Sequence, residues 1–395
     1  MSATATPPAA EAADPNRPVL VTGGNGFIGQ HLVATLRRRG NRVRVLDVQR
    51  PALPASGEFI HGSILDRQAV SRAMQGVRAV YHLAAVSHLW LPDPGEYERV
   101  NHHGTQVLLA AAAQAGSPRF IHCSTEAILF PPLGSSGDIR LEDMPGPYTR
   151  SKFLAEQAAR EAAGRGMSVV IVNPTVPIGP GDHNMTAPTA MLSLFARHPP
   201  RLLLDCTLNL VDVRDVAKGI ALAGERGRTG ERYILGGENI GMRDLAGRIG
   251  KLTGRPTAPL PIPGVLALAA SWAAERLATG VTGRPPVATP EGVRIAMRSI
   301  PLDIRKTSDE LGYAPGAIGQ ALTDALAWLA PPQSAPAGLE APVAAKMRRV
   351  AVRPHPEKRP AFGPDQAAEA TRLGVIAAND AAMTLRSPRR RACDP

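Results

Sequence analysis

Several residue types are scarce in this chain, and each shortage narrows what the protein can be. Among 395 residues there are three cysteines, Cys123, Cys206 and Cys393, and no two of them have zinc-ligand or redox-motif spacing. Aromatic residues make up only 4%, so aliphatic side chains must fill the interior. The N-terminus lacks the basic start and apolar run of a secretory signal. We therefore expect a cytoplasmic protein with no metal site.

Long apolar runs are also missing. The most apolar stretch, residues 265–278, is shorter than the roughly 20 residues that a membrane span needs, and Glu275 and Arg276 interrupt it. We expect a helix that faces the core here; a peripheral membrane anchor is the alternative. The formal charge of +11 would suit nucleic acid, but much of the excess lies near the C-terminus and no nucleic-acid-binding motif accompanies it. The expected partner is therefore a small-molecule substrate.

The first half of the chain alternates between β-branched runs and helical patterns. Strands are expected at 18–22, 42–47, 58–61, 79–83, 119–124 and 168–173, and helices at 28–39, 67–74, 96–115 and 147–165. Such alternation predicts an α/β fold in which a doubly wound parallel sheet, a Rossmann sheet, is covered by helices on both faces. Its ligand crevice should lie at the carboxyl ends of the strands.

Beyond residue 173, proline and glycine interrupt the pattern more often. The elements expected there include a helix at 213–224, a strand at 232–235 and a helix at 242–253. They predict a smaller C-terminal lobe on the substrate side. The expected organisation is a disordered N-terminus at 1–17, a nucleotide-binding core at 18–173, mainly a substrate-binding lobe at 174–330, and a disordered basic tail at 331–395.

A glycine-rich turn follows the first expected strand. Gly23 would permit the tight turn, Gly26 would let a pyrophosphate approach the backbone, and Gly29 would let the helix pack closely on the sheet. The amides at the start of that helix would then face the anion. The turn therefore predicts a dinucleotide site with the contact residues Gly23, Asn25, Gly26, Phe27, Ile28 and Gly29.

Further cofactor contacts are expected at the ends of the next strands. Asp47 ends the second strand, where a carboxylate binds the adenosine ribose hydroxyls and repels a 2′-phosphate. This favours NAD, with NADP as the alternative because Arg50 stands nearby. Asp66 could reach the adenine or could cap the helix at 67–74. The other expected contacts in these segments are Ile64, Leu65, Leu83, Ala84 and Ala85.

A second group of residues suits proton transfer. Tyr148 and Lys152 stand four apart on one expected helix, so they share a face. A nearby ammonium would lower the tyrosine pKa and make the phenol a general acid or base. Thr125, or as second choice Ser124, would orient the substrate oxygen; the alternative is that these hydroxyls cap strand-end amides. Glu126 is either a further acid or base or a solvated side chain.

Three more polar residues flank these motifs. Asn101, on the helix expected at 96–115, should hold water or backbone near Tyr148 and Lys152. His82 and His122 lack metal-ligand spacing, and we expect both histidines to lie on strands with their hydrogen bonds satisfied.

Together these motifs resemble the extended short-chain dehydrogenase/reductase superfamily, in its NAD-dependent epimerase/dehydratase branch. Stretches at 82–85, 89–94, 148–156, 172–180, 209–211 and 230–239 are similar to the hopanoid-associated sugar epimerases, to which dihydroflavonol reductases and 3β-hydroxysteroid dehydrogenases are related. The resemblance implies a Thr125–Tyr148–Lys152 triad with Asn101 as a fourth member. It also implies cofactor contacts from Asn173 and Pro174, and a homodimer.

Other residues depart from that pattern. Many nucleotide-sugar members carry an arginine before a His-Val-Asp-Asp-Val segment; here the region reads Leu208 to Val216, with Asp212 for the histidine. Leu208 cannot clamp a pyrophosphate. We expect an NAD(P)-dependent enzyme that moves hydride to and from a hydroxyl or carbonyl carbon of a sugar-like substrate. The alternatives are a reductase or dehydrogenase of an apolar flavonoid-, steroid- or terpenoid-like ketone or alcohol, and a non-catalytic NAD(H) sensor.

Overall fold

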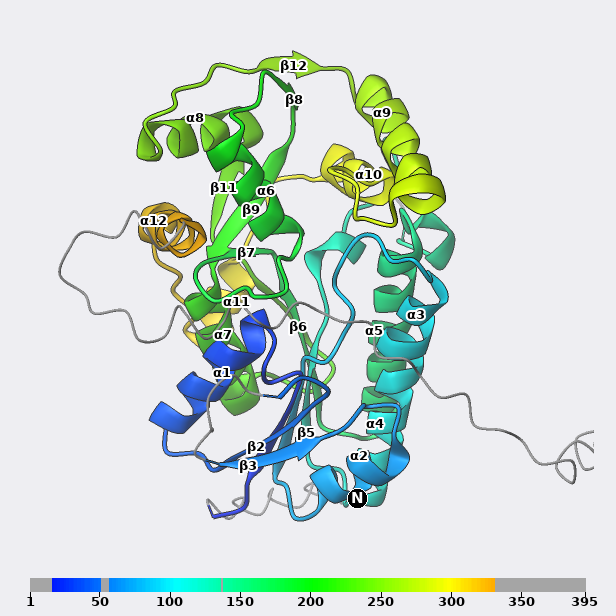
Figure 1. The fold of residues 1–395 in the computed structure, drawn as a ribbon. Coiled ribbons are helices and arrows are strands. Elements are labelled where there is room, and N and C mark those ends of the chain that lie inside the picture. Colours follow the sequence, from blue (N-terminus) through cyan, green and yellow to red (C-terminus); the bar gives the residue numbers. More distant parts are fainter. Residues whose placement is uncertain (1–15, 51–56, 136–137, 331–395) are drawn as a thin grey trace, which may run out of the picture. The chain divides into compact units, whose positions relative to one another are not determined.

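The computed structural model describes residues 16–50, 57–135 and 138–330. Most of the N-terminal segment and all of the C-terminal tail for which we expected disorder lie outside the described residues. A parallel sheet of seven strands, in the order β10-β6-β5-β4-β1-β2-β3, forms the centre (Figure 1). The strands are β1 (Val19–Thr22), β2 (Val43–Asp47), β3 (Glu58–His61), β4 (Ala79–His82), β5 (Arg119–Cys123), β6 (Val169–Pro174) and β10 (Arg232–Leu235).

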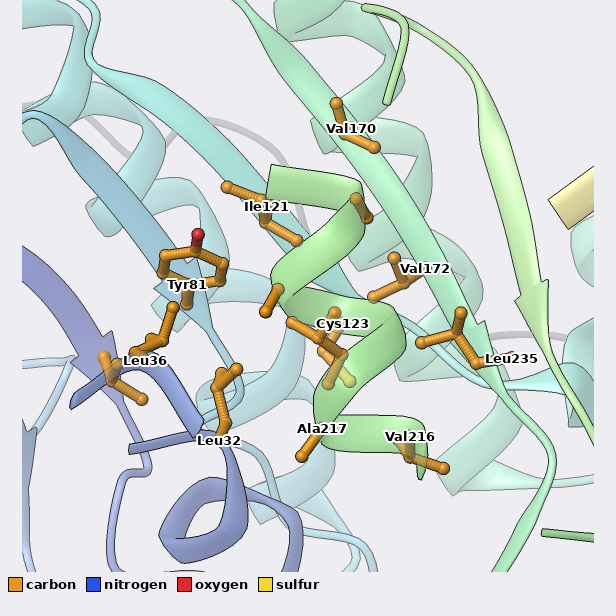
Figure 2. Close-up of a cluster of buried hydrophobic side chains, with 14 of the residues drawn as sticks. Leu32, Leu36, Tyr81, Ile121, Cys123, Val170, Val172, Val216, Ala217 and Leu235 are labelled. Atoms are coloured by element: carbon orange, nitrogen blue, oxygen red, sulfur yellow. The ribbon is translucent and has the colours of Figure 1, made fainter. Parts of the chain in front are cut away.

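Helices cover both faces of this sheet, as expected. On one face lie α1 (Phe27–Arg38), α7 (Val213–Arg226) and α11 (Arg305–Leu311); on the other lie α2 (Arg67–Met74), α4 (Gly104–Gln114) and α5 (Pro147–Gly164) (Figure 1). The strands read as apolar runs because both of their faces are buried. Figure 2 shows the first interface, where Leu32 and Leu36 of α1 and Val216 of α7 meet strand residues such as Ile121. The predicted doubly wound α/β fold is confirmed.

Strand order reverses beside β1, which pairs with β2 on one side and β4 on the other. Such a reversal places a crevice at the carboxyl ends of these strands. The helix expected at 96–115 is divided here: α3 (Gly95–Tyr97) leads into a π-helical segment, η1 (Glu98–His103), and then into α4. π-Helical turns are frequent at functional sites.

The later part of the chain builds a smaller lobe and also completes the main sheet. The helix α7 and the strand β10 belong to the main sheet layer, whereas β7 (Val176–Ile178), β9 (Thr207–Asp212) and β11 (Glu238–Gly241) form a separate sheet. A third apolar cluster joins this small sheet to α6 (Ala187–Arg197), α8 (Met242–Leu252) and α12 (Ile318–Leu329). The remaining elements are β8 (Leu202–Leu204), β12 (Leu260–Ile262), α9 (Gly264–Leu277), η4 (Ala278–Thr282), α10 (Pro290–Arg298), η2 (Glu126–Ile128) and η3 (Leu141–Asp143).

One expectation about this lobe is wrong. The apolar stretch at 265–278 does form a helix, α9, but Ser271 is its one buried residue. The helix lies at the edge of the lobe, packed against α10 (Figure 1). Because only a narrow strip of α9 meets the protein, most of its apolar side chains face outward. Among the described residues, no helix has both the length and the apolarity that a membrane crossing requires.

Candidate active site

The glycine turn between β1 and α1 has the form that a diphosphate requires. Gly23 adopts a φ of +70°, and a Cβ there would lie 2.7 Å from the Ala84 nitrogen. A Cβ on Gly29 would overlap the Gly23 carbonyl oxygen. At Gly26, by contrast, a Cβ would meet only that carbonyl oxygen, at 3.3 Å. The backbone at Gly26 is therefore open to a ligand, and the turn fits a dinucleotide pyrophosphate.

The start of α1 supports the same interpretation. Within the described chain, no side chain caps this helix at Gly26. The first amides of a helix have no intrahelical acceptor, so those of Phe27 and Ile28 are free to serve an anion. The expected residues of this turn thus lie together at the carboxyl edge of the sheet.

The two acidic residues expected near the adenosine have different surroundings. The buried Asp47 carboxylate accepts hydrogen bonds from the amides of Asn25, at 2.9 Å, and Gln49, at 2.8 Å. It therefore ties the end of β2 to the glycine turn. Asp66 caps α2 by accepting amide hydrogen bonds at 2.9 and 3.2 Å from its first turn. The capping role considered for Asp66 is confirmed, and its contact with adenine stays a prediction.

The segment after β4 lies against the glycine turn. The close approach of the Ala84 nitrogen to Gly23 places this backbone beside the expected cofactor. Ile64 is buried against Gly104 of α4, which has no room for a side chain. Of the other residues expected here, Leu65, Leu83 and Ala84 are half-buried and Ala85 is exposed.

The helix α5 brings Tyr148 and Lys152 to the end of β5. Tyr148 is half-buried, with its ring edge-on to that of Tyr97 at 6.2 Å between centroids. Lys152 is buried, and its ammonium donates a 2.7 Å hydrogen bond to the Cys123 carbonyl oxygen. The amine is thus held at the strand end, where the nicotinamide side of the crevice is expected.

The expected lowering of the Tyr148 pKa is not found. Burial raises the pKa of Tyr148, and the carboxyls of Glu126 and Glu291 raise it further, while a hydrogen bond with Thr125 lowers it. The Lys152 ammonium donates to the Cys123 carbonyl. Burial in turn lowers the pKa of Lys152. The structure therefore joins Tyr148 to Thr125 rather than to Lys152.

Thr125 and Glu126 form a buried hydroxyl–carboxyl pair beside the phenol. The Thr125 hydroxyl accepts from the Ala127 amide at 3.3 Å and donates to Glu126 Oε2 at 3.1 Å. Burial raises the pKa of Glu126 to about 7. Glu126 is therefore not the solvated side chain that was one of its two expected states. The threonine caps a backbone amide, as one of its two expected roles requires, and its contact with a substrate oxygen stays a prediction.

Asn101 holds backbone near the site, as expected. Its side chain accepts from the Val86 amide at 2.7 Å, and donates to the Val86 carbonyl at 3.0 Å and to Ser151 Oγ at 2.9 Å. Because Ser151 lies between Tyr148 and Lys152, Asn101 connects the segment after β4 to the part of α5 that carries these two residues.

Asn173 performs a similar task at the end of β6. Its amide donates to the Thr125 carbonyl at 2.9 Å and to Glu156 Oε2 at 3.0 Å. Its Oδ1 and the Ser124 hydroxyl are buried without a hydrogen-bond partner in the described part of the chain. Pro174 follows, buried at the end of β6. Buried polar atoms left unpaired at the carboxyl edge are suited to a bound ligand.

The two strand histidines differ. His82 is satisfied, as expected, by the hydroxyls of Thr22 at 2.8 Å and Thr105 at 2.9 Å. Neither ring nitrogen of His122 has a partner among the described residues, so that expectation is wrong for His122. Its ring lies 5.5 Å from that of His82, and burial lowers its pKa well below the usual value. His122 is therefore neutral, and we have no physical account of its unpaired nitrogens.

Glu291 on α10 is a site residue that sequence reasoning missed. Its buried carboxylate accepts from the amides of Tyr148, at 3.2 Å, and Thr149, at 2.7 Å, and from Thr149 Oγ1 at 2.8 Å. It thus caps the N-terminus of α5 from the other lobe. Arg294 and Arg298, further along the same helix, bond the carbonyl oxygens of Pro145 and Asp143. Helical spacing could have grouped these three residues, but nothing in the sequence indicates their distant partners.

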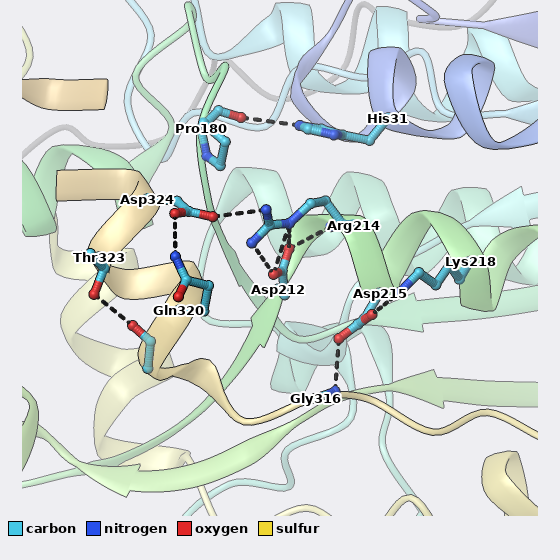
Figure 3. Close-up of polar contacts among 11 residues, drawn as sticks. His31, Pro180, Asp212, Arg214, Asp215, Lys218, Gly316, Gln320, Thr323 and Asp324 are labelled. Carbon is cyan, nitrogen blue, oxygen red and sulfur yellow. Dashed lines mark hydrogen bonds and ion pairs between the residues drawn. The ribbon is translucent and has the colours of Figure 1, made fainter. Parts of the chain in front are cut away.

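The arginine near the expected substrate side is already paired. Arg214 donates to both oxygens of Asp212, at 2.9 Å from Nε to each, and forms a 2.8 Å ion pair with Asp324 of α12 (Figure 3). Two carboxylates satisfy one guanidinium here. Arg214 is therefore poorly placed to bind a substrate phosphate.

The loop after β7 crosses to the nucleotide side. The Gly181 carbonyl accepts from Gln30 Nε2 of α1 at 2.6 Å, and the Asn184 carbonyl lies 2.9 Å from His88 Nε2. Figure 3 shows the neighbouring contact, in which the Pro180 carbonyl lies 3.0 Å from His31 Nε2. The loop therefore links the smaller lobe to the segments that follow β1 and β4.

Comparison with known proteins gives the class that this fold and site define. The model of the NAD-dependent epimerase/dehydratase family matches residues 19–236. A putative dihydroflavonol 4-reductase of Synechocystis sp. is 36% identical over 326 residues, covering 78% of this chain and 93% of the relative. Sterol demethylase protein B of Methylococcus capsulatus is 30% identical over 318 residues, covering 78% and 97%.

Solved structures agree. A nucleoside-diphosphate-sugar epimerase from Pseudomonas aeruginosa superposes with a TM-score of 0.63 at 26% identity, covering 79% of this chain and 97% of that one. The protein is thus an enzyme of the extended short-chain dehydrogenase/reductase type, an NAD(P)-dependent oxidoreductase or epimerase. Within that class, the chain belongs to the NAD-dependent epimerase/dehydratase family.

Proposed function

We propose that the enzyme oxidises a hydroxyl or reduces a ketone on an apolar, sterol- or terpenoid-like molecule, with NAD as its cofactor. The observation that carries the substrate class is the ion-paired Arg214, together with Leu208 at the position where nucleotide-sugar members carry an arginine. A lobe without a free arginine at these positions is poorly suited to a sugar diphosphate. The names of the dihydroflavonol reductase and sterol demethylase relatives favour the same class.

In this proposal Tyr148 and Thr125 bind the substrate oxygen, and Glu126 acts through Thr125. Tyr148, whose raised pKa keeps the phenol protonated, gives its proton to a ketone oxygen, or takes a proton from a substrate hydroxyl once its own proton has left to solvent, and Thr125 donates a hydrogen bond to the same oxygen. The Thr125 hydroxyl has one proton, which in this structure is donated to Glu126; when Glu126 is protonated, as its pKa of about 7 allows, its own O–H donates to the Thr125 oxygen and frees the threonine proton for the substrate. When bound, NAD⁺ would provide the hydride acceptor for oxidation and NADH the hydride for reduction. Buried Lys152 would hold the cofactor ribose, and Asp47 would bind the adenosine ribose and select NAD over NADP.

The substitution Tyr148→Phe tests this assignment. It removes the proton donor and keeps the ring, so kcat on a sterol or terpenoid alcohol should fall by about 100-fold or more, with the affinity for NAD unchanged. Tyr97→Phe is the matched control, since that hydroxyl is bonded to the His88 carbonyl at 2.9 Å, and it should retain most of the activity. Full activity in Tyr148→Phe would refute the catalytic role.

The second candidate is epimerisation of a nucleotide sugar. The likeness to the Pseudomonas aeruginosa structure favours it, as do the residues that resemble the sugar epimerases. The two reactions differ in redox balance, because an epimerase returns the hydride to its substrate. A net absorbance change at the nicotinamide band during turnover of a sterol or terpenoid alcohol supports the dehydrogenase. Turnover of a sugar nucleotide without such a change would replace our first proposal with the second.

A further inference from the structure

The outward face of α9 is apolar except at Arg276, near the end of the helix. Val265 is 69% exposed and Leu266 is 60% exposed at its start, and Trp272 and Leu277 continue the exposed face. The alanines between them are exposed too, at 269, 270 and 273. These positions recur every three to four residues and so form one stripe. A surface helix of a globular protein normally has the opposite arrangement, with its polar side outward.

The apolar surface extends beyond α9. The segment that follows carries Val281, 77% exposed, and Val287, 82% exposed, and the strand before it carries the exposed Leu260. Large exposed apolar surfaces mark places where a protein meets a partner or a membrane.

The segment that carries this surface is basic wherever its charged side chains are exposed. Over residues 251–300, all of which are described, every charged residue that is exposed is basic: Lys251, Arg255, Arg276, Arg284. Glu275 is half-buried and Glu291 is buried under α5. We propose that this face, α9 with η4 and the residues to Val287, rests on an anionic lipid bilayer. Apolar side chains would enter the interface, and the arginines would meet the headgroups.

A second copy of the chain fits less well. A two-fold interface through α9 would bring the same patch of both copies together, with Arg276 and Arg284 on each side. Like charges brought together in this way repel, whereas anionic headgroups neutralise them.

The α9 face lies close to the helix that carries Tyr148. Trp272 packs under the Arg294 guanidinium, 5.5 Å from the ring centroid, and Arg294 bonds the Pro145 carbonyl just before Tyr148. The bilayer would therefore lie next to the lobe that holds the catalytic helix. An apolar substrate dissolved in lipid could reach the enzyme there, but the docking itself does not depend on the proposed reaction.

Vesicle binding by the full-length protein tests the inference. We expect binding to vesicles of phosphatidylcholine mixed with phosphatidylglycerol and much weaker binding to phosphatidylcholine alone. Arg276→Glu/Arg284→Glu should weaken binding by at least about fivefold for each arginine. Val265→Glu/Leu266→Glu should weaken it by tenfold or more, about the effect expected for keeping two apolar side chains out of lipid.

Val48→Glu is the matched control for Val265→Glu, because Val48 is a 60% exposed valine at the end of β2. It should bind vesicles as the wild type does, and circular dichroism should show all variants folded. Equal binding by Val265→Glu/Leu266→Glu and the wild type would overturn the inference, as would absence of wild-type binding. A dimer that dissociates in that variant, without vesicle binding, would assign the face to self-association instead. None of these outcomes bears on the Tyr148 assignment.

Discussion

Glu126 is an acid whose ionisation the fold opposes. Burial raises its pKa from 4.5 to about 7, so the folded state binds a proton that the unfolded chain releases. Its contribution to stability is therefore complete below pH 4.5 and is lost as the pH rises through about 7. This loss amounts to at most about 3 kcal/mol.

The substitution Glu126→Gln should remove that pH dependence. The glutamine amide stays neutral and can still accept a hydrogen bond from Thr125. The free energy of unfolding of the variant, relative to that of the wild type, should therefore increase as the pH rises. Urea unfolding at about pH 5 and about pH 8 measures the difference between the two proteins. A constant difference across this interval would show that Glu126 is not the buried acid described here.

Asp47 and Asp66 provide a second test among single residues. Asp47→Asn should weaken NAD binding by about tenfold and reduce the preference for NAD over NADP, because it removes the negative charge beside the ribose. Asp66→Ala should cost about 1 kcal/mol of stability through the lost cap of α2. Calorimetric titration with both nucleotides distinguishes the roles of the two residues. A large loss of NAD affinity in Asp66→Ala would support the predicted contact between Asp66 and adenine.

Among the helices, α5 and α10 form a unit that crosses the two lobes. No side chain at Gly146 caps α5, and Glu291 supplies a carboxylate acceptor for its first amides, which is favourable at a helix N-terminus. The capped amides include that of Tyr148. The position of the Tyr148 phenol is thus set by a residue 143 positions further along the chain.

The substitution Glu291→Ala should therefore act on both stability and catalysis. We expect a loss of about 1–3 kcal/mol, since buried amides lose a charged acceptor, and a lower kcat with little change in NAD affinity. Glu291→Gln should recover part of each. Glu275→Ala, half-buried on α9 and not bonded to α5, is the control. If Glu291→Ala and Glu275→Ala behaved alike, the capping role would be wrong.

Across the described chain, binding of the dinucleotide should stabilise the fold, because the turn, β2 and the segment after β4 all contribute to its site. At 100 times the Kd of NAD, the gain is about 2.7 kcal/mol. Gly26→Val should abolish this gain while leaving the apo protein folded, since a Cβ there meets only the Gly23 carbonyl. Gly164→Val, where a Cβ meets nothing, is the matched control. Thermal unfolding with and without NAD measures the effect, and an NAD shift that survives in Gly26→Val would disprove the assigned turn.

The sheet and its nucleotide turn could be predicted because their signals are local. Strands buried on both faces must be continuous apolar runs, and a turn that brings a helix against a strand must have glycine where a Cβ would collide, as at Gly23 and Gly29. Tyr148 and Lys152 could be paired for the same reason, since helical spacing alone puts them on one face.

Only the tertiary structure determined which distant segments are in contact and how deeply each ionisable side chain is buried. Burial raised the pKa of the Tyr148 phenol instead of lowering it, and the Lys152 ammonium donates to the Cys123 carbonyl. Glu291 contacts α5 from the other lobe. The helix α9 has its apolar side exposed because only a narrow strip of it packs against the protein. The pattern of apolar residues in the sequence indicates which side chains avoid water. It does not indicate which distant surface will bury them, because that depends on how the lobes pack.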